Sequence, residues 1–272
     1  MQLGICSYTY TWAIGVPGST PEKPMNATGL LDKAAELEVQ VVQFCDNLPL
    51  HLLSEQQIND LDNRAKRLGL QVEVGTRKLE PNRLRTYLGL AHRLDSLIVR
   101  IVIDEGDYKP SEDEIIRSIQ EVIADYERLR VTLAIENHDR FAARTLARIV
   151  ERAGSPNVGV CLDTVNSFGA LEGPEAVVET LAPYTVNLHV KDFIIERANH
   201  QMGFVIEGAP AGQGRLDIPW LLGKLRAAGR DPNAIVELWT PPEESLEATI
   251  AKEDRWARES VEYLGEWLVA GG

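Results

Sequence analysis

The chain has 272 residues, of which 44% are hydrophobic and 25% charged, a balance typical of a folded globular protein rather than a disordered one. Its formal net charge of -13 repels phosphate backbones and anionic lipid surfaces, so we expect neither a nucleic acid nor a membrane partner. The first residues contain no basic leader, and no segment approaches the ~20 apolar residues of a membrane span, so we expect a cytoplasmic protein.

Short apolar runs rich in valine and isoleucine recur along the chain, with amphipathic stretches of helical period between them. Most runs lack apolar/polar alternation, as expected for strands buried on both faces of a parallel sheet. We predict eight strands, in chain order LGICSY, VVQFCD, VEVGTR, IVRIVID, VTLAIEN, VGVCLD, VNLHVKD and AIVELW. Cys6, Cys45 and Cys161 fall within such runs, which fits reduced core thiols better than metal ligands.

The stretches between these runs carry helix start and stop signals of their own. Ser54 is positioned to cap a helix that ends at Gly69. Ser111 and Glu114, three positions apart, form a capping-box pattern at the start of another helix. Further start signals are Pro174 and the pair Asp217 and Pro219. The helices therefore support the same number of units as the strands.

Eight alternating strand–helix units without a Pro/Gly/Ser-rich linker favour one closed (β/α)8 TIM barrel over two doubly wound domains. We expect a single α/β domain over residues 1–272. Two long insertions, residues 12–28 after the first strand and residues 192–216 after the seventh, leave the C-terminal ends of their strands, where barrel active sites lie. We expect both to be loops that serve as lids or substrate walls.

Four side chains able to bind a metal end the last four predicted strands: Glu136 in AIENH, Asp163 in CLDTVN, His189 in LHVKD and Glu237 in IVELW. In a closed barrel these strand ends are neighbours. A buried, unpaired carboxylate costs several kcal/mol, so three of them require a compensating cation. One such residue alone would more often be a helix cap, a surface charge or a core histidine, but four in register predict a divalent-metal site.

The predicted donor set of three carboxylates and one imidazole limits the choice of metal. Hard oxygen donors favour Mn²⁺ or Mg²⁺ and also permit Co²⁺ or Zn²⁺. Octahedral coordination would leave about two positions for substrate oxygens. A metal there would polarise the carbonyl group of an α-hydroxy carbonyl compound and acidify its C–H bond, so the sequence predicts an enzyme.

The motifs AIENHDR, CLDTVNSFG, LHVKDF, GAPAGQGRLDIPWLL and IVELW, in this order over residues 131–240, resemble those of the xylose isomerase-like TIM barrels. That superfamily includes ketose 3-epimerases, hydroxypyruvate isomerases, inosose dehydratases and apurinic endonucleases. The resemblance implies that Glu136, Asp163, His189 and Glu237 are metal ligands. It also implies that Glu136 and Glu237 form a catalytic acid/base pair acting on a metal-stabilised enediolate, and that the protein is a homodimer or homotetramer.

Two features separate the chain from particular branches of that superfamily. Many relatives have a histidine three residues after the aspartate of the sixth strand, where this chain has Asn166, which can hydrogen-bond a hydroxyl group but cannot take up a proton. The endonuclease branch needs further histidines for three zinc ions, and VVQFCD and VEVGTR supply none. The net charge also opposes nucleic-acid binding.

Substrate-binding candidates surround the predicted metal site. Tyr8 and Trp12 follow the first strand and could stack on a sugar ring, although aromatic residues there are as often barrel packing. Lys191 and Arg197 could bind an anionic substrate, the alternative being a solvated loop in which Lys191 pairs with Asp192 at the surface. The residues that we assign to substrate binding are Tyr8, Trp12, His138, Asn166, Lys191 and Arg197.

Three hypotheses follow for function. The leading one is a divalent-metal-dependent isomerase or epimerase of a small sugar or sugar derivative. The alternative is a metal-dependent lyase on the same site, either a decarboxylase of a 3-oxo sugar acid or an inosose-type dehydratase, which Asn166 and the cationic segment after the seventh strand modestly favour. A non-catalytic sugar-binding or metal-storage barrel is disfavoured, because a binder needs no matched pair of glutamates.

Overall fold

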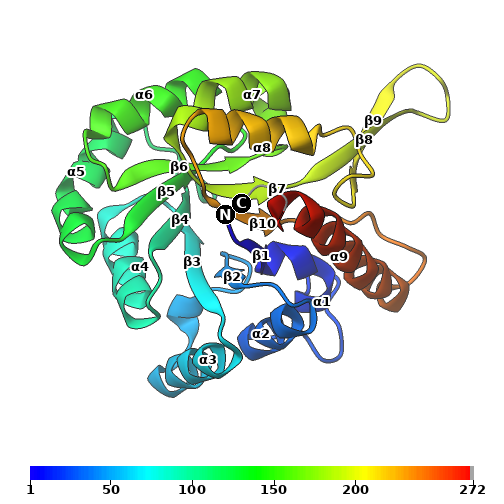
Figure 1. Cartoon of the computed structure of the whole chain (residues 1–272), viewed down its shortest axis with the longest axis horizontal. Helices are drawn as coiled ribbons and strands as arrows, with labels where there is room; N and C mark the ends of the chain where they lie inside the picture. Colours follow the sequence, from blue (N-terminus) through cyan, green and yellow to red (C-terminus); the bar gives the residue numbers. More distant parts are fainter. Residues whose placement is uncertain (270–272) are drawn as a thin grey trace.

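The computed structural model describes residues 1–269 and contains eight parallel strands that close into one barrel, with helices on its outside (Figure 1). In barrel order the strands are β1 (Leu3–Cys6), β10 (Asn233–Val236), β7 (Thr185–Val190), β6 (Val158–Asp163), β5 (Thr132–Glu136), β4 (Ile98–Val102), β3 (Gln71–Arg77) and β2 (Val41–Phe44). Each of the eight predicted runs supplies one barrel strand, which confirms the predicted (β/α)8 fold.

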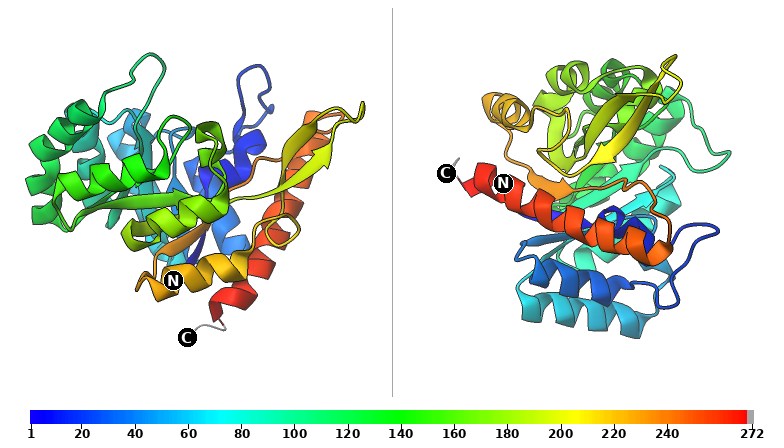
Figure 2. Two further views of the ribbon diagram at one scale, coloured as in Figure 1. Left: turned by 90° about the horizontal axis from the view of Figure 1, so that it is seen from above. Right: turned by 90° about the vertical axis from the view of Figure 1, so that its right-hand side faces the viewer.

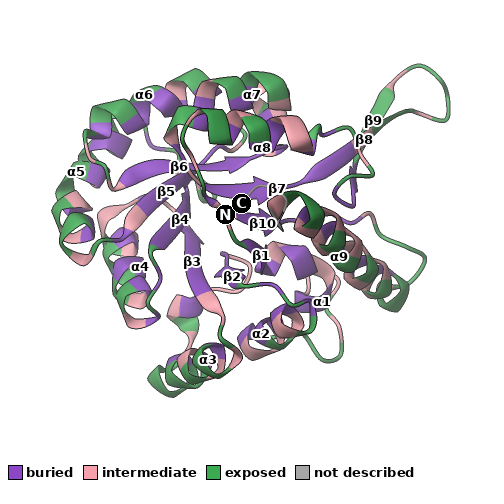
Figure 3. Ribbon diagram, in the orientation of Figure 1, coloured by how far each residue is buried: buried purple, intermediate pink, exposed green. Residues whose placement is uncertain are grey.

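The barrel strands are buried on both faces (Figure 3). Every residue of β1, β2, β4 and β6 is buried. Helices cover the outer face, while the inner face is filled by the strands' own side chains. Neither face therefore selects polar residues, which explains why these runs do not alternate.

The helices that cover the barrel are α2 (Ala27–Glu36), α3 (Glu55–Leu68), α4 (Pro81–Arg93), α5 (Glu112–Leu129), α6 (Ala143–Ala153), α7 (Pro174–Leu181), α8 (Ile218–Ala227) and α9 (Leu246–Val269). Short 3-10 turns are η1 (Ser7–Tyr10), η2 (Leu50–Leu52), η3 (Asn166–Ala170) and η4 (Ala182–Tyr184). Across residues 1–269, none of the helices combines the length and the apolar character that a membrane crossing requires.

The predicted helix boundaries are confirmed at their caps. The Ser54 hydroxyl accepts a hydrogen bond from the Gln57 backbone N–H at the start of α3, and Gly69 ends that helix in the left-handed conformation with a φ of 69°. Asp217 accepts from the Trp220 backbone N–H at 2.9 Å to begin α8. Ser111 forms the expected capping box at the start of α5.

The insertion after β1 starts with α1 (Thr11–Ile14), which is tied to the last helix. The backbone N–H groups of Trp12 and Ala13 donate to the two carboxylate oxygens of Glu253 in α9, at 2.9 and 3.0 Å. The Trp12 indole N–H donates to the Thr240 carbonyl oxygen at 2.8 Å. One wall at the C-terminal end of the barrel is thus fixed by residues more than 200 positions away in the sequence.

The insertion after β7 is not the loop that we predicted. β8 (Asp192–Arg197) and β9 (Phe204–Ala209) pair antiparallel in a hairpin that extends away from the barrel (Figure 2). Two glycines of this segment are required by close packing: a Cβ atom at Gly208 would lie 2.4 Å from Trp239, and one at Gly214 would lie 2.1 Å from Asp192 Oδ1.

The base of this insertion is held together by Asp192. Its carboxylate accepts hydrogen bonds from four backbone N–H groups, at 2.8 to 3.0 Å, donated by Phe193, Gly212, Gly214 and Leu216. The segment 192–216 is therefore closed on itself next to the barrel.

Candidate active site

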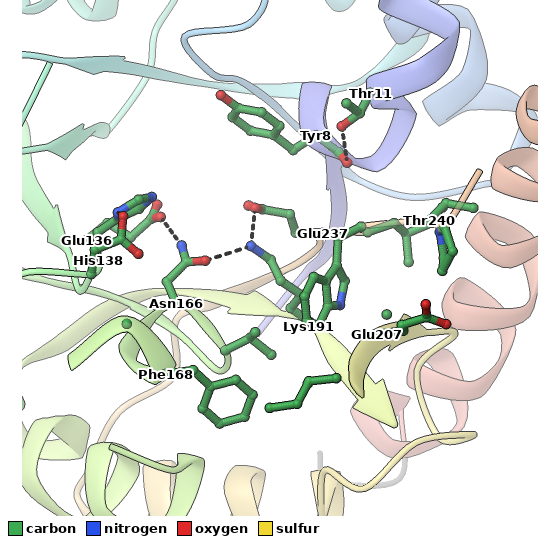
Figure 4. A pocket seen from close by; sticks show the side chains of 18 of the residues that line it. Tyr8, Thr11, Glu136, His138, Asn166, Phe168, Lys191, Glu207, Glu237 and Thr240 are labelled. Atoms are coloured by element: carbon green, nitrogen blue, oxygen red, sulfur yellow. Dashed lines mark hydrogen bonds and ion pairs between the residues drawn. The ribbon is translucent and has the colours of Figure 1, made fainter. Parts of the chain in front are cut away.

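A cavity of about 800 Å³ lies at the C-terminal end of the barrel strands (Figure 4). Its size suits a small molecule. Among the residues that line it are Glu136, Glu237 and five of the six side chains predicted to bind substrate, namely Tyr8, Trp12, His138, Asn166 and Lys191. The cavity therefore gathers residues from both halves of the chain.

The four predicted metal ligands lie close together on β5, β6, β7 and directly after β10, and Glu136 and Glu237 line this cavity. His189 Nδ1 lies 2.8 Å from Glu237 Oε2, 3.4 Å from Glu136 Oε2 and 3.9 Å from Asp163 Oδ2. All four side chains are buried. Glu136 and Glu237, the first and last of the four in the sequence, are 101 positions apart. The order of strands in the barrel brings them together.

The arrangement of three of these side chains fits a divalent cation. Asp163, His189 and Glu237 each offer one ligand atom, and these atoms lie within 4.8 Å of one another. Asp163 Oδ2 and His189 Nδ1 are buried and make no hydrogen bond. Buried polar atoms that make no hydrogen bond are costly, and one cation bound by both would compensate them in addition to the nearby charges of Glu237 and Lys191.

A thiol lies beside the same cluster. Cys161, Glu136 and His189 form a second group of potential ligand atoms. Burial raises the pKa of the Cys161 thiol to about 12, so the sulfur stays protonated at neutral pH. A thiol binds metals far less well than a thiolate. Oxygen and nitrogen donors therefore remain the ligand set that this cluster favours.

Arg100 of β4 is a functional residue that we did not predict. Its side chain is 2% exposed, its Nε donates to Glu136 Oε2, and its Nη1 donates to Asp46 Oδ1 at 2.9 Å. The signal in the sequence was a single charge inside the apolar run IVRIVID. A buried arginine requires carboxylate partners, so that charge pointed to the barrel interior.

Lys191 is the second buried cation of the site. Its Nζ lies 2.6 Å from Glu237 Oε1 and 3.1 Å from Asp163 Oδ2. The alternative in which Lys191 pairs with Asp192 at the surface is therefore wrong, because both side chains are buried and Asp192 binds backbone N–H groups instead. The ammonium group compensates carboxylates inside the barrel.

Asn166 connects the two charged halves of the site (Figure 4). Its Nδ2 donates to Glu136 Oε1 at 2.8 Å, and its Oδ1 accepts from Lys191 Nζ at 3.1 Å. An asparagine can make both bonds at once because its amide carries a donor and an acceptor. Asn166 therefore fixes Lys191 relative to Glu136.

These contacts set the protonation of the site. Burial alone would raise the pKa of Glu237, but the positive charge of Lys191 outweighs it and holds that pKa well below its usual range. Burial is likewise outweighed for Glu136, whose pKa is lowered by the guanidinium group of Arg100. The pKa of Lys191 is raised, because Asp163 and Glu237 outweigh the effect of burial. The two glutamates are anions and Lys191 is an ammonium ion.

A third cation, Arg77 at the end of β3, lines the cavity wall and was also not predicted. Its Nε lies 3.0 Å from Asp46 Oδ2, and its Nη2 lies 3.2 Å from His138 Nε2. The Tyr8 hydroxyl donates to the same Asp46 oxygen at 2.8 Å. Tyr8 and His138 thus lie at the cavity as predicted, and they contact Arg77 or its carboxylate partner there.

Arg197 is the predicted substrate-binding residue that the structure does not bring to the cavity. It lies at the end of β8, where its guanidinium group is 4.3 Å from the ring centroid of Phe204. The side chain runs along the hairpin because an aromatic face is available there. Ile206 and Glu207 of the paired strand line the cavity instead.

Comparisons with known proteins agree with this architecture. The chain is 34% identical over 264 residues to 3-oxo-isoapionate decarboxylase of Pectobacterium atrosepticum, covering 97% of this chain and 95% of that protein. A D-psicose 3-epimerase from Clostridium cellulolyticum H10, solved with D-tagatose, superposes with a TM-score of 0.73 at 18% identity, over 97% of this chain and 98% of that one.

A xylose isomerase-like TIM barrel protein from Mycobacterium smegmatis, solved in complex with magnesium, superposes with a TM-score of 0.67 at 14% identity over 96% of each chain. At these identities the superpositions concern the fold alone. The family model described as xylose isomerase-like TIM barrel matches residues 31–267. With a closed (β/α)8 barrel and a match over most of its length, the chain belongs to the xylose isomerase-like TIM barrel family.

Proposed function

We propose that this chain is a metal-dependent lyase that removes CO₂ from a small 3-oxo sugar acid. The observation that carries the proposal is that both carboxylate oxygens of Glu136 are engaged, one by Arg100 Nε and the other by Asn166 Nδ2. An isomerase or epimerase needs a carboxylate that takes a proton from carbon, and a carboxylate paired with a buried guanidinium is a weak base. Decarboxylation needs no such base, because the electron pair is released when the C–C bond breaks.

The charges around the cavity support an anionic substrate. Arg77, Arg100 and Lys191 face the carboxylates described above, and a bound divalent cation would add further positive charge. Arg77 has the most accessible side chain of the three cations, at 32%. We assign it to the substrate carboxylate, which a guanidinium binds through two parallel hydrogen bonds. The decarboxylase relative, aligned over 95% of its own length, supports the same substrate class.

Lys191 is placed to complete the reaction. Loss of CO₂ leaves an enediolate, and the carbon that carried the carboxylate must take up a proton to give the ketose product. Lys191 Nζ holds that proton at the cavity, and Glu237, Asp163 and Asn166 fix its position. A bound divalent cation would supply Lewis-acid polarisation of the 3-oxo group. Solvent then restores the ammonium group.

The test is a substrate panel with two separate readouts. Purified protein is supplied with Mn²⁺ or Mg²⁺ and given 3-oxo sugar acids, ketoses and inososes in D₂O. We expect CO₂ release from a 3-oxo acid well above the spontaneous rate, with deuterium in the product at the carbon that carried the carboxylate. Carbon-bound deuterium appearing in ketoses, with no enzymatic CO₂ release from any acid, would overturn the proposal. Loss of water from an inosose would instead identify a dehydratase.

An isomerase or epimerase remains the second candidate. The observation that favours it is that Glu136 and Glu237 line one cavity from β5 and from the residue after β10. A pair of carboxylates on either side of a substrate could exchange protons with carbon. This reading requires Glu136 to leave Arg100 during turnover, and deuterium exchange into ketoses is the measurement that detects it.

A further inference from the structure

Glu73 of β3 is a buried carboxylate outside the cavity. Its side chain lies inside the barrel with no exposed surface, and none of the ion pairs among residues 1–269 includes it. It is held by amide groups instead: Gln43 Nε2 and Asn187 Nδ2 donate to Oε2 at 2.9 Å each, and Asn233 Nδ2 donates to Oε1 at 2.7 Å. Keeping a carboxylate there costs several kcal/mol relative to an apolar residue, so its presence needs a reason.

Glu73 determines which way the neighbouring amides point. The Glu73 oxygen Oε2 accepts hydrogen bonds from Gln43 Nε2 and Asn187 Nδ2, so both amides turn their NH₂ groups toward it. Gln43 Nε2 donates a second hydrogen bond to Asn187 Oδ1 at 2.9 Å, which fits the same orientation. The carbonyl oxygen of Gln43 is therefore directed away from Glu73, toward the active site.

His189 donates a hydrogen bond to that carbonyl oxygen. His189 Nε2 lies 2.7 Å from Gln43 Oε1, and because an amide oxygen only accepts, Nε2 must carry a proton. The opposite ring nitrogen, Nδ1, is the atom that faces Asp163 and Glu237. The orientation of one amide thus decides which histidine nitrogen can offer a lone pair to a cation.

We infer that Glu73 is a positioning residue for the metal site, acting through Gln43 to hold the proton of His189 on Nε2 and leave Nδ1 for the cation. The inference rests on the metal site of the proposed function. Histidine ligands commonly donate their other N–H group to a partner that orients the ring and raises its basicity. Here the neutral amide of Gln43 lies between the Glu73 carboxylate and the His189 imidazole, so Glu73 acts on His189 only through Gln43.

The test uses Glu73→Gln, which keeps the size of the side chain but lets Gln43 turn its amide around. We expect the dissociation constant for Mn²⁺, measured by electron paramagnetic resonance, to rise about 10- to 100-fold. In the metal-free protein, at a pH high enough to leave the imidazole of His189 neutral, ¹⁵N spectra of the histidine rings report which of its two nitrogens is protonated. The chain has 5 histidines, so His189→Ala assigns the signal. We expect the Nε2 proton of His189 in the parent and a loss of that preference in Glu73→Gln.

The matched control is Asn233→Ala, which removes the donor to the other oxygen of Glu73 without touching Gln43. A purely structural role predicts that both variants lose stability and that neither changes the histidine spectrum. We expect Asn233→Ala to keep its Mn²⁺ affinity within about twofold and its Nε2 proton. A folded Glu73→Gln that matches the parent in both readouts would overturn the inference.

If Glu73→Gln does not fold, Gln43→Met takes its place, because it removes the acceptor for His189 directly. An unchanged histidine spectrum and Mn²⁺ affinity in Gln43→Met would then overturn the inference. Neither readout involves turnover. If the parent protein binds Mn²⁺ but decarboxylates no substrate, the proposed function is wrong, and the measurements above still decide the role of Glu73. If the parent protein binds no divalent cation, the proposed function and the role of Glu73 are both wrong.

Discussion

The Lys191 ammonium lies 2.6 Å from Glu237 Oε1, while His189 Nδ1 lies 2.8 Å from the other oxygen of the same carboxylate. Glu237 is therefore shared between a group that holds a proton and a group that offers a lone pair. In the proposed lyase the first would protonate carbon and the second would bind the cation. The two functions can be separated by substitution.

Lys191→Met removes the ammonium group and keeps most of the volume of the side chain. We expect kcat to fall by about 10²- to 10⁴-fold, the usual contribution of a positioned acid. Mn²⁺ affinity should be kept or increased, because the ammonium no longer neutralises Asp163 and Glu237. Steady-state kinetics and Mn²⁺ titration measure the two effects, and a kcat within tenfold of the parent would remove Lys191 from the chemistry.

Glu237→Gln and His189→Ala should each lower bound Mn²⁺ and abolish turnover, because each removes one donor from a cluster of three. Metal content after dialysis, measured by mass spectrometry, checks the first effect. Glu207→Gln is the matched control, since Glu207 lines the same cavity and is not in the cluster. Full metal occupancy and normal rates in either variant would refute the metal site.

Arg100→Met should destabilise the fold by about 3–5 kcal/mol, because it leaves the buried Glu136 without its guanidinium partner, whereas Asp46 keeps its pair with Arg77. Urea unfolding measures the loss. Arg85→Met, which removes an exposed pair with Glu121, should cost no more than about 1 kcal/mol. Adding Glu136→Gln to Arg100→Met should recover part of the stability, and an additive double variant would argue against the buried pair.

Arg77→Met should raise KM for an anionic substrate by about tenfold, equivalent to about 1.4 kcal/mol, with a smaller effect on kcat. Arg197→Ala should leave kcat/KM within about twofold, because its guanidinium lies on Phe204 and not at the cavity. Arg77→Lys, which keeps the charge, should restore part of the binding. A larger loss of kcat/KM in Arg197→Ala than in Arg77→Met would instead support the prediction from the sequence that Arg197 binds the substrate.

Glu253 gives the stability a pH dependence. Burial raises its pKa from 4.5 to about 8. Because the folded pKa is the higher one, the stability it contributes is fully present below pH 4.5 and is lost as the pH rises through about 8. Between pH 5 and pH 8.5 the parent should lose more unfolding free energy than Glu253→Gln, by at least about 1 kcal/mol. If the free energy of unfolding, measured with urea, falls equally with pH in the parent and in Glu253→Gln, this prediction is contradicted.

The fold could be predicted because burial on two faces leaves a strong mark on sequence. Each barrel strand is a short run of apolar residues, and Ser54 and Asp217 mark helix starts by hydrogen bonds that need particular side chains. The four candidate metal ligands could be picked out for the same reason, since each interrupts or ends an apolar run. The hairpin was missed because the segment after the seventh strand was predicted to be a loop from its position at the C-terminal end of the barrel.

The missed site residues have a different cause. Arg100 carried the same signal as the ligands, a charge in an apolar run, but it is a cation and was not considered as part of an acidic site. Arg77 and Gln43 lie on strands in the first half of the chain. Their partners lie in the second half, more than 60 positions away: His138 contacts Arg77, and His189 contacts Gln43. Pairing across a closed barrel depends on register, which a single sequence does not specify.

The four hydrogen bonds that Asp192 accepts have a consequence for how this enzyme family can change. They seal the base of segment 192–216, so the hairpin tip between Arg197 and Phe204 can be lengthened, shortened or exchanged without breaking any pairing between barrel strands. That hairpin also carries Ile206 and Glu207 to the cavity wall. Changes confined to the hairpin can therefore reshape one wall of the cavity, while Arg77 and the charged residues at the ends of the barrel strands stay in place.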